Sequence, residues 1–110
     1  MTILKFFKTN GKFVKLECSG HTGYDEFGKD VLCATISGIV QSCYLGLTEV
    51  LHINAKLERQ LDDGNIKFEL PKNIDDNKLN QSQILFETVF VSIEDLQKGY
   101  SKYISMEVIE

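Results

Sequence analysis

Two short strand-like segments joined by an Asn-Gly pair constrain the fold of this chain most. Residues 2–8 are rich in β-branched and aromatic side chains. In residues 12–18, Val14, Leu16 and Cys18 alternate with Phe13, Lys15 and Glu17. The Asn10-Gly11 pair between them favours a tight type I′ turn, so the start of the chain is expected to form a β-hairpin. The side chains expected on the core face of its second strand are Val14, Leu16 and Cys18.

A second hairpin is expected in the middle of the chain. Residues 53–61 alternate with period two, the pattern of a half-exposed strand. Asp62-Asp63-Gly64-Asn65 has turn chemistry, and the alternation resumes over residues 66–70 until Pro71 ends it.

Each hairpin is followed by a long segment with helical periodicity. Asp30 is placed to cap the first helix, which is expected to run to about Leu51, with a kink or an earlier end at Gly46. The apolar positions expected to line it are Val31, Ala34, Ile39, Val40, Cys43, Leu47, Val50 and Leu51.

The second helix is expected to begin at residues 75–77 and to end between Gly99 and Lys102. Its core stripe is predicted to be Leu79, Gln83, Phe86, Phe90, Ile93, Gln97 and Tyr100, thickened by Leu85, Val89 and Leu96. Residues 104–108 alternate again and close the order ββαββαβ. This order predicts a single α+β domain, residues 1–110, with two helices packed on a small, mostly antiparallel sheet.

Composition and charge restrict the classes of function. The 110-residue chain carries a net charge of −4, with an isoelectric point near 5.2, and 43% of its residues are hydrophobic. An acidic protein is poorly suited to binding phosphate backbones, so no direct nucleic-acid partner is expected. A basic protein partner would be attracted instead.

The protein is expected in the cytoplasm and is not expected to associate with a membrane. Residues 1–8 lack the features of a secretory signal, and the apolar segments read as too short and too interrupted by charge to span a bilayer. The three cysteines, Cys18, Cys33 and Cys43, are odd in number and contain no close pair. They are therefore expected to be free thiols, because this spacing suits neither a disulfide framework nor a CxxC zinc site.

The loop before the first helix carries the candidate chemistry. Residues 19–29 contain His21 and three glycines, and Cys33 would be the third residue of a helix capped by Asp30. The N–H groups and dipole of a helix N-terminus favour an anion such as a thiolate, and His21 could accept the thiol proton and return it to a leaving amine. The same N–H groups could stabilise an oxyanion. Ser37 falls on the same helical face as Cys33.

Spacing alone leaves other readings open. A histidine and a cysteine twelve residues apart occur by chance in many proteins. Cys18, His21, Asp30 and Cys33 could be metal ligands, although a closed zinc site normally brings paired cysteines or histidines, which ranks metal below catalysis. Asp30 could serve only as a cap, Ser37 could only pack, and the loop could be a plain connector.

Three residues with reactive side chains are expected to have no part in the chemistry. Cys18 and Cys43 lie on apolar faces and are expected in the core, where cysteine is common. His52, at the junction between a helix and a strand, is expected to be a surface or capping residue.

A longer pattern makes the segment recognisable. Gly20-His21, the run from Gly23 to Ala34, and Ser37 closely resemble the signature of the ribosomal-processing cysteine protease family, Prp, in which His and Cys are twelve apart. The chain length, the order of elements and the Asp-Asp-Gly turn also resemble that family.

The resemblance implies an activity and a set of roles. Members of the family form homodimers and remove a short N-terminal extension from a large-subunit ribosomal protein, cutting after an aromatic residue. On this basis Cys33 would be the nucleophile and His21 the general base, while Asp30 would orient or cap and Ser37 would support the site. The loop containing Gly20, Gly23 and Gly28 would be a mobile cover ordered by substrate, and no metal or organic cofactor is implied. The competing hypothesis is a non-catalytic, ribosome-associated module that binds a peptide.

Overall fold

The computed structural model describes residues 1–21, 23–25, 30–60 and 65–110. The elements are β1 (Thr2–Thr9), β2 (Lys12–Ser19), α1 (Val31–Leu45), a π-helical turn η1 (Gly46–Val50), β3 (Lys56–Gln60), β4 (Asn65–Glu69), α2 (Asp76–Gly99) and β5 (Ile104–Ile109). This order confirms the predicted α+β fold and the predicted order of elements, ββαββαβ.

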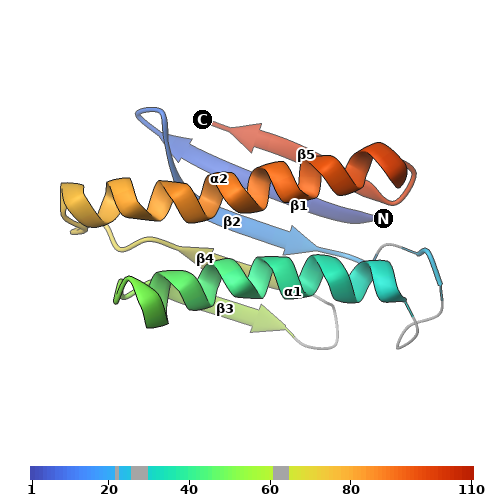
Figure 1. The fold of residues 1–110 in the computed structure, drawn as a ribbon, viewed down its shortest axis with the longest axis horizontal. Helices are drawn as coiled ribbons and strands as arrows, with labels where there is room; N and C mark the ends of the chain where they lie inside the picture. Colours follow the sequence, from blue (N-terminus) through green and yellow to red (C-terminus); the bar gives the residue numbers. More distant parts are fainter. Residues whose placement is uncertain (22, 26–29, 61–64) are drawn as a thin grey trace.

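The five strands form one mixed sheet in the order β3-β4-β2-β1-β5. Neighbouring strands are antiparallel except β1 and β5, which run parallel. Both helices lie on the same face of the sheet (Figure 1). The core fills the space between the helices and this face, and its most deeply buried large side chains include Phe6, Leu16, Ile36, Phe68, Phe86 and Ile93.

The predicted core face of β2 is wrong at one position. Leu16 and Cys18 are buried as expected, but Phe13 is buried in place of Val14. The cause is an irregularity in the β1–β2 register: Phe7 pairs with Lys15 whereas Lys8 pairs with Phe13, so Val14 is the extra residue of a bulge. A bulge reverses the alternation of side chains along the bulged strand.

A buried amide joins this bulge to α2. The side chain of Gln83 accepts a hydrogen bond from the backbone N–H of Phe13 at 2.7 Å and donates one to the Phe13 carbonyl oxygen at 2.8 Å. Gln83 lies on the predicted stripe of α2, with Phe86, Val89 and Ile93 also buried. The polar member of the stripe is therefore satisfied by the strand on which the helix packs.

The first helix follows the prediction in extent but only in part in the face it buries: Val40, Cys43 and Leu47 are buried as predicted. It continues through η1 to Val50, and its geometry changes at Gly46, where an added Cβ would lie 2.8 Å from Leu85 of α2. The buried positions are Leu32, Ile36, Val40, Cys43 and Leu47, whereas the expected positions Val31, Ala34 and Val50 are exposed. Because α1 carries apolar residues on its outer face too, its periodicity did not identify the core face.

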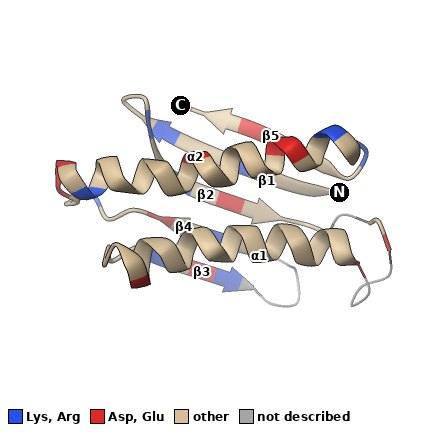
Figure 2. Ribbon diagram, viewed as in Figure 1, with Lys and Arg blue, Asp and Glu red and all other residues tan. Residues whose placement is uncertain are grey.

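The expectation that every apolar segment is too short or too interrupted by charge to span a bilayer is wrong for α1 and η1. Residues 31–50 are long and apolar enough to cross a membrane, by length and composition only, with a mean hydropathy of 1.5. In Figure 2 α1 carries no charged residue, and the charge in η1 is Glu49. Since its inner face is packed into the core against the sheet, the segment has the position of a core helix in a globular domain.

The second hairpin is shorter than predicted. Ile53 and Ala55 are buried, but β3 begins only at Lys56, because the N–H of Ile53 is bonded to Leu47 and that of Ala55 to Ile53. Of the expected turn, residues 62–64 lie outside the described residues, and its last residue, Asn65, is the first residue of β4.

Charged side chains alternate across the sheet face opposite the helices. Lys67 on β4 lies 3.3 Å from Glu17 on β2 and 3.9 Å from Glu58 on β3. The hydrogen bond to Glu17, aided by the nearby carboxylates, raises the pKa of Lys67. Pairs of this kind across neighbouring strands favour one register of the sheet.

Candidate active site

The candidate residues meet at one end of the molecule. The chain leaves the end of β2, passes through the glycine-bearing loop and enters α1 at the same end (Figure 1). His21 therefore follows a strand of the sheet, and Cys33 lies in the first turn of the helix that covers it.

Asp30 links the helix to the loop. Its Oδ1 accepts a hydrogen bond from the N–H of Cys33 at 2.9 Å, which is the predicted N-cap. Its Oδ2 accepts from the N–H of Tyr24 at 3.1 Å and from that of Asp25 at 3.4 Å. Since Asp30 is only 8% exposed, this one carboxylate fixes the start of α1 and the middle of the loop together.

The structure brings the predicted His21 and Cys33 together. The Sγ atom of Cys33 lies 3.7 Å from Nδ1 of His21, and both residues are partly exposed. Cys33 is the third residue of α1, where the helix N-terminus favours a negative charge. This arrangement can pass a proton between sulfur and imidazole and present the sulfur to a substrate.

The expected oxyanion donors need one correction. The N–H of Cys33 donates to the side chain of Asp30, and that of Ala34 donates to the Asp30 carbonyl oxygen at 3.1 Å. Both donors are therefore already used within the helix start, and an oxyanion would have to be bound by other N–H groups of the first turn.

The direction of the loop is set at Gly20. This residue has a φ of +79°, a conformation that side chains rarely adopt, and an added Cβ would lie 2.6 Å from the carbonyl oxygen of Met1. Its N–H donates a hydrogen bond to Oδ1 of Asn65 at 3.2 Å. Glycine is therefore required at the residue that precedes His21.

An aromatic cluster holds the middle of the loop. The ring of Tyr24 packs edge-on against Tyr100, with centroids 5.6 Å apart, and against Tyr103, at 5.4 Å. Tyr100 follows the last residue of α2, and Tyr103 precedes β5. Such T-shaped pairs add to the stability of contacts beyond the area they bury.

The remaining predicted site residues have mixed outcomes. Gly23 has a φ of +73° with open space around it, so it serves the turn of the loop. Ser37 lies one turn after Cys33, but its hydroxyl accepts a hydrogen bond from Nε2 of Gln41 at 2.8 Å, further along α1. Gly28 lies outside the described residues.

The other cysteines are buried thiols. All three cysteines are free, as predicted, and Cys18 and Cys43 are buried whereas Cys33 is partly exposed. Burial raises the pKa of both Cys18 and Cys43 to about 12, with a further contribution for Cys18 from nearby Cys33. No group of three or more His, Cys, Asp or Glu side chains arranged for a metal ion occurs in the described part of the chain. Cys18, His21, Asp30 and Cys33, the residues of the alternative metal reading, do not form such a group.

Two contributions to the site had no signal in the sequence. Asn65 bonds to Gly20 from 45 residues away, and Tyr24 contacts two tyrosines near the C-terminus. In each case a residue of ordinary type acts on the loop only because the fold brings distant segments together.

Comparison with known families agrees with this geometry. Residues 1–105 match the sequence model of a family described as cysteine protease Prp. The chain is 26% identical over 87 residues to the ribosomal processing cysteine protease Prp of Bacillus subtilis, covering 79% of this chain and 78% of the relative. It is 24% identical over 99 residues to the protein of the same name from Staphylococcus aureus, covering 87% of each.

Solved structures share the fold. The structure described as an essential ribosomal processing protease Prp from S. aureus with a covalently linked product peptide has a TM-score of 0.86 at 17% identity, covering 98% of this chain and 99% of that one. The same protease with a substrate peptide gives 0.81 at 16% identity and the same coverage. The structure of SMU.848 from Streptococcus mutans gives 0.83 at 22% identity, covering 99% of this chain and 94% of that one.

Proposed function

Because this chain belongs to the Prp family of cysteine proteases, we propose that it removes the short N-terminal extension of a large-subunit ribosomal protein, cutting after an aromatic residue. The observation that carries the proposal is the 3.7 Å approach of Cys33 Sγ and His21 Nδ1 at the start of α1, in a chain that matches the family over residues 1–105. The catalytic unit is a single domain, residues 1–110.

Cys33 acts as the nucleophile and His21 as the general base. The thiol proton passes to His21, the sulfur attacks the carbonyl carbon of the scissile bond, and the carbonyl oxygen becomes an oxyanion. Collapse of this intermediate breaks the C–N bond, and the leaving amine takes the proton from His21. Water, deprotonated by His21, then hydrolyses the thioester and releases the N-terminal product.

The helix start supplies the electrostatic support for these steps. The N–H groups of Val31 and Leu32 are the remaining donors of the first turn and are assigned to the oxyanion, since those of Cys33 and Ala34 are bonded to Asp30. The buried Asp30 carboxylate keeps the loop and Cys33 at a fixed separation. Ser37 supports the site indirectly, through its hydrogen bond to Gln41.

The loop that begins at Gly20 contacts the substrate. The described part of it lies beside Cys33, so a bound peptide must pass against it. Closure of a loop over bound substrate would hold the scissile bond against Cys33 and complete the site.

The partners follow from charge and from the relatives. A net charge of −4 favours approach of a basic ribosomal protein. Relatives of the same fold have been solved with a substrate peptide and with a covalently linked product peptide, which supports a peptide as the ligand here. The enzyme is expected to work as a homodimer in the cytoplasm, where ribosomes are assembled.

Cleavage of a synthetic peptide tests the proposal. A peptide that carries the extension and the first mature residues of the ribosomal protein is incubated with the wild type, Cys33→Ala, His21→Ala and, as a matched control at a buried thiol, Cys43→Ala. Mass spectrometry should show one cut after the aromatic residue with the wild type and Cys43→Ala, and none with the other two. Binding without product in all four would favour the peptide-binding module, and cleavage by Cys33→Ala would remove the nucleophile.

A further inference from the structure

The backbone pairing between β2 and β4 ends just before His21 and is followed by a hydrogen bond from a side chain. The paired register of these strands ends at Cys18 and Ile66. Two residues further along the chain, just after the end of β2, the N–H of Gly20 donates a hydrogen bond at 3.2 Å to the side-chain oxygen of Asn65. A side chain from β4 therefore continues the attachment of the chain to the sheet after the regular pairing has ended.

Two neighbours restrict Gly20. The carbonyl oxygen of Met1 lies 2.6 Å from where a Cβ would be, so no larger residue fits here. The side-chain oxygen of Asn65 accepts a hydrogen bond from the Gly20 N–H. With a φ of +79°, the residue makes the turn after which the chain presents His21 to Cys33. The position of the imidazole therefore depends on how firmly this turn is fixed.

We propose that Asn65 is a positioning residue of this protease: its side-chain oxygen fixes the turn at Gly20 and thereby sets the distance between His21 and Cys33. The inference rests on the proposed function, because it assigns Asn65 a task in the same catalytic site. A misplacement of about 1 Å between reacting groups can lower a rate by about 100-fold, so a residue without contact to substrate can still control the chemistry.

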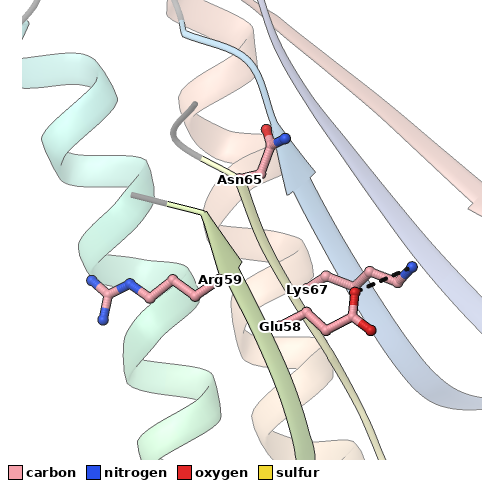
Figure 3. A pocket seen from close by; sticks show the side chains of 4 residues that line it. All are labelled: Glu58, Arg59, Asn65 and Lys67. Atoms are coloured by element: carbon pink, nitrogen blue, oxygen red, sulfur yellow. Dashed lines mark ion pairs between the residues drawn. The ribbon is translucent and has the colours of Figure 1, made fainter. Parts of the chain in front are cut away.

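The surroundings of Asn65 indicate that its side chain can be removed without unfolding the protein. Asn65 lines a cavity of about 410 Å³ together with Glu58, Arg59 and Lys67, at the start of β4 (Figure 3). Gly20 and Asn65 are both only partly buried, so water can bind the N–H of Gly20 when it loses its partner. Removal of the amide would therefore leave the N–H of Gly20 solvated, and the fold would be kept while the turn loses its fixed direction.

Alkylation of Cys33 reports the pairing without any substrate. Iodoacetamide reacts with thiolates, and the other two thiols are buried, so the rate of modification at Cys33 can be followed by mass spectrometry across pH. The variants are Asn65→Ala, which removes the acceptor, and Asn65→Asp, which keeps an oxygen in its place. Glu58→Ala changes the same cavity without touching Gly20, and His21→Ala shows the profile of a thiol without its imidazole.

In Asn65→Ala we expect the pH of half-maximal alkylation to move toward that of His21→Ala, and kcat for peptide cleavage to fall about tenfold. Asn65→Asp and Glu58→Ala should remain within about twofold of the wild type, and all melting temperatures should lie within about 5 °C of it. A wild-type alkylation profile in Asn65→Ala would overturn the inference, as would equal losses in Asn65→Ala and Asn65→Asp. Because alkylation needs no peptide, a failure of the proposed substrate leaves this test intact.

Discussion

Substitutions of Asp30 can separate its cap from its attachment of the loop. Serine retains one oxygen in reach of the Cys33 N–H, whereas it has no second oxygen for the N–H groups of Tyr24 and Asp25, now bonded at 3.1 and 3.4 Å. Serine is as good an N-cap as aspartate, so Asp30→Ser should preserve α1 while it releases the loop. Alanine removes both functions.

The expected losses of stability can be worked from these contacts. Loss of a cap costs about 1 kcal/mol, and loss of hydrogen bonds from exposed N–H groups that water can replace costs about 1 kcal/mol more. Asp30→Ala should therefore lose about 2 kcal/mol of the free energy of unfolding, and its melting temperature should fall by roughly 8–16 °C. Asp30→Ser should lose only about 1 kcal/mol, because Tyr24 and Asp25 are exposed and water can bind their N–H groups.

The matched control lies in the other helix. Asp75 caps α2 through the N–H of Lys78 at 2.8 Å. The start of α2 lies at the opposite end of the molecule from the start of α1 (Figure 1). Asp75→Ala should lose about 1 kcal/mol and keep its peptidase activity. Asp30→Ser should lose a similar amount of stability, but its cleavage of the peptide should be reduced about tenfold or more.

Urea unfolding followed by circular dichroism measures the stability of each variant, and the initial rate of peptide cleavage measures its activity. If Asp30→Ser cleaves the peptide as fast as the wild type, the attachment of the loop by Oδ2 has no catalytic consequence. If Asp30→Ala is no less stable than Asp75→Ala, Asp30 is a cap alone. Either result would refute the dual role.

Two further predictions concern backbone strain and buried thiols. Gly20→Ala should lower the free energy of unfolding by more than Gly11→Ala. Both glycines have a positive φ, which costs an alanine about 1 kcal/mol, but of the two only Gly20 leaves no room for a Cβ. Equal losses in urea unfolding of the two variants would contradict this. Stability should also fall from pH 9 upward, since Cys18 and Cys43, with pKa values raised from 9.0 to about 12, stay protonated in the folded chain and ionise in the unfolded one. Each thiol should cost about 1 kcal/mol at pH 10, and Cys43→Ala should remove its share of the pH dependence; an unchanged dependence would contradict the effect of burial.

The parts of the fold that could be predicted depend on residues a few positions apart. Both helix starts followed from an aspartate before an apolar segment, and the caps at Asp30 and Asp75 form as that signal indicates. The first hairpin followed from its Asn-Gly turn, whose residues both have a positive φ. The loop that joins His21 and Cys33 made their pairing one possible reading, and the resemblance to the Prp family implied it.

The parts that could not be predicted depend on contacts between distant segments. The bulge at Val14 reverses one strand face and is visible only in the pairing with β1. The core face of α1 is decided by the sheet beneath it, since Val31 and Leu32 are both apolar and only Leu32 is buried. The hold of Asn65 on Gly20 likewise requires the β2–β4 pairing, which no local pattern encodes.

Covalent capture of Cys33 by a substrate-like peptide tests the central claim most directly. A peptide that ends at the aromatic residue with a chloromethyl ketone should form a single thioether with the enzyme, in which sulfur displaces chloride. Peptide mapping should place the adduct on Cys33, with none in Cys33→Ala and a rate at least tenfold slower in His21→Ala. An adduct on another residue, or an equal rate without the imidazole, would contradict a nucleophilic sulfur at the start of α1 that is activated by His21.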